Sequence, residues 1–158
     1  MAARAASLLL ALLAAVPAAA AGAPHIEGYA SQRNGEAYLR EGPGYNYPVL
    51  WVYHHRGYPF AVTASFDIWR RVLAPDGTVG WMSSTMLSDR RTVLVTGSGR
   101  APVHADPGGG KLVGLADPGA VANLKTCTAT ACRITGGGID GWIDRSRIWG
   151  VGVQEVFH

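Results

Sequence analysis

The sequence lacks the marks of a helical protein. After its N-terminal segment, no stretch of about ten residues sustains the 3.6-residue apolar spacing of an amphipathic helix. Instead, 21 glycines and nine prolines divide the chain into short runs rich in β-forming residues. Frequent turns without long helices predict an all-β fold built from small barrels or sandwiches.

Cysteine is almost absent, because the chain of 158 residues has two, Cys127 and Cys132. A structural zinc site takes four ligands, so two cysteines alone make a poor one. In an exported chain an even count favours a disulfide, and the four residues between these two fit a bridge across a tight hairpin. Such a bridge would stabilise the fold by roughly 2 kcal/mol.

Motifs of known catalytic sites are also missing. The sequence has no His-Glu-x-x-His zinc motif and no Gly-x-Ser-x-Gly elbow. A Cys-His pair would have to combine Cys127 or Cys132 with His104, and a disulfide would remove both thiols as nucleophiles. His54 and His55 would face opposite ways on a strand, which argues against one shared ion. We therefore expect no enzyme, no cofactor and no metal site.

Charge of one sign is not concentrated anywhere. Fourteen Lys and Arg residues against eleven Asp and Glu give a net charge of +3, and most of the arginines stand alone. A nucleic-acid binder would cluster its basic residues, so nucleic acid is not an expected partner. The mildly basic balance suits an anionic wall or membrane surface, and ordinary solubility explains it equally well.

The longest apolar segment is too short to cross a bilayer. Residues 5–16 follow Arg4 and precede Pro17 and four alanines, whereas a membrane span needs about 20 apolar residues. A positive start, a short apolar core and small residues are typical of a secretory signal peptide. We therefore expect residues 1–21 to be removed, leaving a periplasmic or secreted chain of 137 residues (158 − 21) without a stable membrane span.

What the chain does have is a repeated hairpin. Residues 69–82 place two apolar, aromatic-bearing runs on either side of a Pro-Asp-Gly turn, and residues 132–143 form a shorter echo. Gly80-Trp81 and Gly141-Trp142 lie 61 positions apart (142 − 81). This spacing predicts two similar small β-domains, at residues 24–88 and 91–155.

Further strands are expected on both sides of each hairpin. In residues 60–66 the alternation places Phe60, Val62, Ala64 and Phe66 on one face. Other runs predicted as strands are residues 36–40, 49–53, 92–96, 111–115 and 120–127. After the first hairpin, residues 83–87 are compatible with one helical turn, and residues 146–151 hold the matching place after the second.

Several motifs together resemble the bacterial SH3 domain, and more narrowly the exported tandem SH3-like proteins of proteobacteria, long filed as a family of unknown function. The motifs are Leu39-Arg40-Glu41-Gly42-Pro43-Gly44, Trp69-Arg70-Arg71-Val72, Asp76-Gly77-Thr78-Val79-Gly80-Trp81, Cys132-Arg133, Gly141-Trp142 and Trp149-Gly150. The resemblance covers about residues 27–155. It implies a small β-barrel of five to six strands per repeat and the binding of cell-wall or peptide ligands.

The two copies differ in ways that place the ligand site in the first. The second copy has His104-Ala105-Asp106-Pro107 in place of an Arg-x-Gly-Pro opening, and Ala131 where the family commonly has an aromatic residue. Trp81 and Trp142 recur in both copies and are assigned to the barrel cores. The loop that carries Tyr45 and Tyr47 does not recur.

Aromatic side chains therefore mark the expected ligand groove. Its predicted residues are Tyr45, Tyr47, Trp51, Tyr53, Tyr58 and Trp69. Aromatic walls suit sugar faces and extended peptides, although large aromatic residues also fill small barrel cores. Arg40 is a candidate contact for an acidic ligand group, or else a structural residue that pairs with Glu41 or Asp67.

These observations predict an exported, non-catalytic protein that recognises peptidoglycan or its peptide through an aromatic groove. The alternative is a periplasmic protein–protein interaction or scaffold module that binds a peptide segment. A wall hydrolase is the least favoured class.

Overall fold

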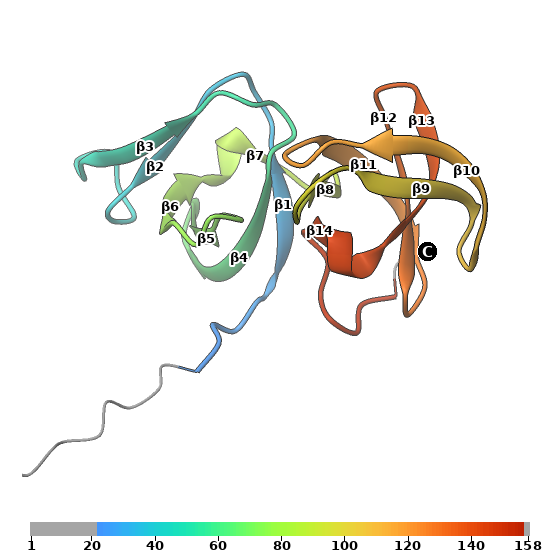
Figure 1. Ribbon diagram of the computed structural model, residues 1–158. Helices are drawn as coiled ribbons and strands as arrows, with labels where there is room; N and C mark the ends of the chain where they lie inside the picture. Colours follow the sequence, from blue (N-terminus) through green and yellow to red (C-terminus); the bar gives the residue numbers. More distant parts are fainter. Residues whose placement is uncertain (1–21, 157–158) are drawn as a thin grey trace, which may run out of the picture.

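The computed structural model describes residues 22–156 as an all-β chain with two seven-stranded sheets, which confirms the predicted fold class of two tandem SH3-like barrels (Figure 1). The expected signal peptide lies outside the described residues. The first sheet contains β1 (Gly28–Gln32), β2 (Ala37–Arg40), β3 (Val49–Tyr53), β4 (Pro59–Phe66), β5 (Trp69–Leu73), β6 (Val79–Ser83) and β7 (Leu87–Ser88). The second contains β8 (Thr92–Val95), β9 (Ala101–Asp106), β10 (Gly109–Ala116), β11 (Val121–Cys127), β12 (Ala131–Gly136), β13 (Ile139–Asp144) and β14 (Ile148–Trp149).

The two sheets share one strand order. The first runs β3-β2-β6-β5-β4-β1-β7 and the second runs β10-β9-β13-β12-β11-β8-β14. Their registers also correspond, because Arg40 pairs with Trp81 in the first sheet as His104 pairs with Trp142 in the second. The repeated hairpin in the sequence therefore reflects two copies of the same barrel.

In each barrel the Gly-Trp strand, β6 or β13, joins the β2–β3 or β9–β10 hairpin to the other strands of its sheet, and we call it the closing strand. A Cβ atom on Gly80 would lie 2.6 Å from the Leu39 side chain and 2.9 Å from the carbonyl oxygen of Arg40. A Cβ atom on Gly141 would lie 2.6 Å from the carbonyl oxygen of His104. Glycine is required at both places because two backbones approach too closely for a side chain.

Each closing strand leads into a capped 3-10 turn. The side chain of Ser83 accepts a hydrogen bond from the backbone N–H of Thr85 and caps the turn Ser84–Met86. The side chain of Asp144 accepts one from Ser146 and caps the turn Arg145–Arg147. A serine and an aspartate thus perform the same capping role in the two barrels.

An aromatic cluster fills the core of the first barrel. The ring of Tyr53 stacks on Tyr58 at 5.4 Å between centroids and meets Phe60 edge-on at 5.0 Å. Tyr53 is 7% exposed, and its burial raises the pKa of its hydroxyl to about 12. Tyr53 and Tyr58, predicted as groove residues, instead pack in this core, because Tyr53 lies at the buried end of β3.

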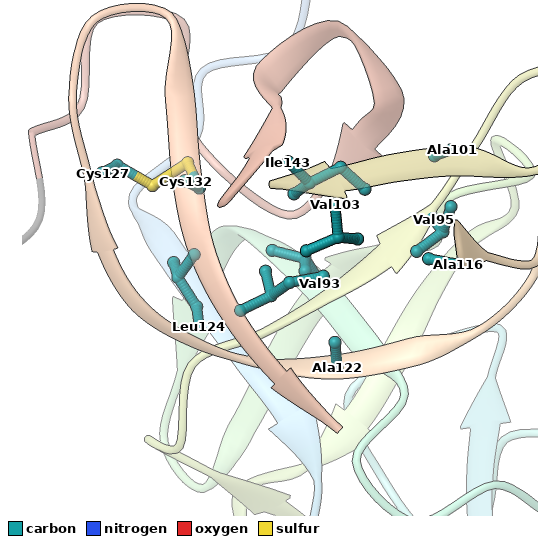
Figure 2. Packing of buried hydrophobic residues seen from close by; sticks show 11 residues of the cluster. Val93, Val95, Ala101, Val103, Ala116, Ala122, Leu124, Cys127, Cys132 and Ile143 are labelled. Carbon is teal, nitrogen blue, oxygen red and sulfur yellow. A yellow bond between two sulfur atoms is a disulfide. The ribbon is translucent and has the colours of Figure 1, made fainter. Parts of the chain in front are cut away.

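The core of the second barrel is aliphatic and is bordered by a disulfide. Figure 2 shows Val93, Val103 and Ile143 meeting inside it, with the sulfur atoms of Cys127 and Cys132 at one side. The two cysteines pair directly across β11 and β12, and the predicted disulfide joins them. The bridge therefore fastens one hairpin of this barrel.

The predicted alternation in β4 fails at its far end. Phe60 is buried, but the pairing of β4 with β5 shifts between Val62 and Ala64. Such an irregularity interrupts the two-residue alternation of inward and outward side chains. Phe66 accordingly ends up 60% exposed instead of sharing the core face with Phe60.

The two barrels also contact each other. Tyr29 of β1 meets Trp149 of β14 edge-on at 5.9 Å, and the guanidinium of Arg91 lies over the Tyr29 ring at 5.1 Å. Arg91 also forms an ion pair with Glu155, and it holds the pKa of that carboxyl below its usual range. β1, β8 and β14 therefore form the seam between the two barrels (Figure 1).

Replacing a closing glycine should weaken the fold. Gly80→Ala adds a Cβ atom against two neighbouring groups, so we expect the free energy of unfolding in urea to fall by about 1–3 kcal/mol. The control is Gly35→Ala, because a Cβ atom on Gly35 has nothing within 4 Å. Equal stability of the two variants would contradict the proposed role of Gly80.

The buried hydroxyl of Tyr53 should titrate late. Its pKa is raised from 10.0 to about 12 in the folded state, so its contribution to stability is complete below pH 10 and is lost as the pH rises toward about 12. The pKa values of Tyr29, Tyr38 and Tyr58 are raised as well, so alkaline absorbance titration should show several steps above the ordinary range, and Tyr53→Phe should remove the step near pH 12. The exposed-site control Tyr45→Phe should retain the step, and its loss there would refute the assignment.

Candidate functional site

The loop between β2 and β3, residues 41–48, folds back against the start of β5. Its Tyr45 ring meets the Trp69 ring edge-on, with 4.9 Å between the centroids. Tyr45 is 62% exposed, whereas Trp69 is buried beneath it. The structure thus brings these two predicted groove residues together, but only Tyr45 presents a large surface to solvent.

Arg40 holds this loop in place. Its Nη1 atom donates hydrogen bonds to the carbonyl oxygens of Tyr45 at 3.2 Å and Tyr47 at 2.8 Å. Its guanidinium also lies 5.8 Å from the Tyr45 ring centroid. Arg40 therefore has a structural role, as one prediction proposed, but its partners are carbonyls and not the carboxylates of Glu41 or Asp67.

Gly42, the first glycine of the Gly-Pro-Gly motif, makes room for the ring of Tyr47. A Cβ atom on Gly42 would lie 2.5 Å from the ring of Tyr47. The ring thus packs directly on the backbone of Gly42, and any larger residue there would push it away. Tyr47 remains exposed on its other side. The motif therefore shapes the loop that presents both tyrosines.

Strand β3 extends the exposed surface along the edge of the sheet. Val49, Leu50 and Trp51 are all exposed, although consecutive residues of a strand point to opposite faces. The sequence analysis identified Trp51 but missed Val49 and Leu50. An unbroken apolar run was the available signal, but it is equally typical of a strand buried on both faces.

These side chains lie on the β2–β3 hairpin and its loop, and we call them together the hairpin surface. It consists of Arg40, Tyr45, Tyr47, Val49, Leu50 and Trp51. Aromatic faces, aliphatic groups and one guanidinium can pack against a ligand and orient an acidic group on it. The Nε and Nη2 atoms of Arg40 have no hydrogen-bond partner among the described residues, so they remain available to such a group.

The two cysteines and His54, which were considered as catalytic or metal-binding residues, make structural contacts instead. Cys127 and Cys132 are joined to each other, and His54 lies 3.5 Å from a carboxylate oxygen of Glu36. Trp81 and Trp142, predicted to be core residues, are only partly buried on the closing strands and belong to neither core cluster.

A metal-binding cluster and a membrane-spanning helix are both absent from residues 22–156. No group of three or more His, Cys, Asp or Glu side chains in this range is arranged to hold a metal ion. No helix in the same range has the length and apolar character needed to traverse a bilayer.

Known structures that are similar to this chain include two distant ones from Trichomonas vaginalis. NlpC2 is 11% identical at a TM-score of 0.36 and matches 77% of this chain and 47% of its own. NlpC1 is 12% identical at a TM-score of 0.38 and matches 87% of this chain and 50% of its own. The chain thus spans about half the length of these proteins. No protein of curated function matches it.

The comparison with protein families gives a match over more than half of the chain. The sequence profile of the bacterial SH3 domain matches the chain twice, over residues 33–89 and residues 98–150. The first match contains the hairpin surface and the closing glycine Gly80, and the second contains the corresponding Gly141. Both matches coincide with a sheet of the same strand order. The chain therefore belongs to the bacterial SH3 domain family and carries two copies of its domain.

Proposed function

We propose that this is an exported, non-catalytic binding protein whose first barrel recognises peptidoglycan or its peptide through the hairpin surface. Bacterial SH3 domains are generally binding modules. The observation that carries the proposal is the exposure of Tyr45, Tyr47 and Trp51 on one hairpin, while the other aromatic residues predicted for the groove are buried or packed against the core. The expected signal peptide supports a periplasmic or secreted location.

A ligand that covers the hairpin surface gains binding free energy by removing its rings from water. Large rings exposed to water gain free energy when a partner covers them, and they lose little conformational entropy because they have few rotatable bonds. The hydrogen bonds of Arg40 already order the loop of Tyr45 and Tyr47, which lowers the entropic cost of binding. Free donors of the same guanidinium suit a carboxylate of a wall peptide.

The second candidate function is the binding of a peptide segment of another protein. Strand β3 is an edge strand, since it stands first in the order β3-β2-β6-β5-β4-β1-β7. An edge strand offers unpaired backbone groups to which an extended peptide can add as a further strand. The exposed side chains of Val49, Leu50 and Trp51 would then flank the added strand.

Sedimentation with purified sacculi tests the wall proposal. The variant Tyr45→Ala/Tyr47→Ala/Trp51→Ala should bind at least about tenfold more weakly, since truncating central aromatic contacts commonly costs more than about 1 kcal/mol each. Leu112→Ala is the matched control, because Leu112 is also exposed and lies on β10, the equivalent edge strand of the second barrel. The control should sediment like the wild type.

Four other results would count against the wall proposal. Absence of wild-type sedimentation, or unchanged sedimentation of the triple variant, would contradict it. Capture of a periplasmic protein by the wild type but not by the triple variant, without sacculus binding, would support the peptide-segment function. Release of soluble fragments from sacculi would show a hydrolase.

A further inference from the structure

A pocket of about 380 Å³ opens in the second barrel, between the β9–β10 turn and the ends of β12 and β13. Trp142, His104, Asp106 and Asp144 are among the residues that line it. Ala131 is the small buried residue among the lining groups. This pocket contains no residue of the hairpin surface.

The pocket exists because two groups that occupy the same place in the first barrel are missing. Trp69 pairs with Ser83 in the first barrel as Ala131 pairs with Asp144 in the second, so an alanine replaces an indole. The loop of residues 41–48 lays Tyr45 on that indole, whereas the corresponding residues 105–111 extend β9 and β10 to a tight turn at residues 107–108. The second barrel thus leaves open a space that the first fills with its own aromatic rings.

The charge at this place is also reversed. By the same register, the first barrel has Arg40 where the second has His104, and Ser83 where the second has Asp144. The second barrel has therefore lost a guanidinium and gained a carboxylate. Asp106, at the end of β9, adds another carboxylate to the lining.

Neither carboxylate is held in an ion pair, while Oδ1 of Asp144 accepts the hydrogen bond from Ser146 that caps the 3-10 turn. Among residues 22–156, no basic side chain lies within 4.0 Å of either one. Arg147, the nearby cation that contributes to the low pKa of Asp144, donates its hydrogen bonds to the carbonyls of Thr96, Ser98 and Gly99. Hydrogen bonds from Ser146 are the main cause of that low pKa, so the Asp144 carboxyl is ionised at neutral pH.

We propose that this pocket binds an arginine side chain of a partner peptide. The planar guanidinium would stack on the Trp142 indole and pair with the carboxylates of Asp144 and Asp106, a combination that favours arginine over lysine. The first barrel shows a related arrangement, because the guanidinium of Arg40 lies 5.8 Å from the Tyr45 ring centroid and donates to two backbone carbonyls. This site is independent of the function proposed for the hairpin surface.

An NMR titration of the full chain tests the site. The probe is the blocked peptide acetyl-Gly-Arg-Gly-amide, and its neutral counterpart carries citrulline in place of arginine. We expect a saturable shift of the Trp142 indole N–H signal with the arginine peptide and at least a tenfold weaker response with the citrulline and lysine peptides. The Trp51 indole signal, on the hairpin surface, should not move.

Two variants place in the second barrel the residues that the first barrel has at the equivalent positions, Ser83 and Trp69. Asp144→Ser keeps the cap of the 3-10 turn, as Ser83 does in the first barrel, but removes the carboxylate, and it should weaken binding at least tenfold. Ala131→Trp should close the pocket and abolish the shift. Asp117→Asn is the charge-matched control, because Asp117 is exposed, pairs with Arg100 outside this pocket, and should leave binding unchanged.

The proposal is overturned if citrulline binds as well as arginine, or if Asp144→Ser binds like the wild type. Equal binding of lysine would overturn the preference for a guanidinium. Asp144→Ser remains decisive if Ala131→Trp does not fold. Sacculus binding through Tyr45, Tyr47 and Trp51 is measured separately, so failure of either proposal leaves the other result readable.

Discussion

The close approach of two backbones at Gly80, and again at Gly141, is the constraint on which both barrels depend. It lets β6 pair with β2 and β13 pair with β9, and each pairing joins the β2–β3 or β9–β10 hairpin to the rest of its sheet. Domains this small bury a limited fraction of their surface, so closure is needed to exclude water from the core. The contact of each barrel with its neighbour adds to the area that is covered.

Because closure fixes the scaffold, the two copies are free to differ at one corresponding place. In the first barrel Trp69, Tyr45 and Arg40 fill it, and the excess aromatic and apolar surface faces outward along the β2–β3 hairpin. In the second, Ala131 and a shorter turn leave it open and lined by carboxylates. The same fold thus offers one exposed aromatic surface and one acidic pocket.

The sequence was sufficient to predict the all-β class, the two copies, the disulfide and the 3-10 turn after the first hairpin, because glycine spacing and strand pattern are local signals. It could not separate exposed aromatic residues from buried ones. Tyr53 and Trp51 are two positions apart on β3, yet one lies in the core and the other faces solvent, because β3 leaves the barrel only along part of its length. The shift in β4 that exposes Phe66 likewise depends on the pairing with β5.

The most direct test of the proposed function is an NMR titration of the full chain with soluble peptidoglycan fragments. The account predicts saturable shifts of the Trp51 indole signal and of the backbone amides of Tyr45 and Tyr47, with the amides of Gly80 and Gly141 unchanged because barrel closure is not disturbed. Absence of shifts in the hairpin surface, or shifts confined to the second barrel, would contradict it.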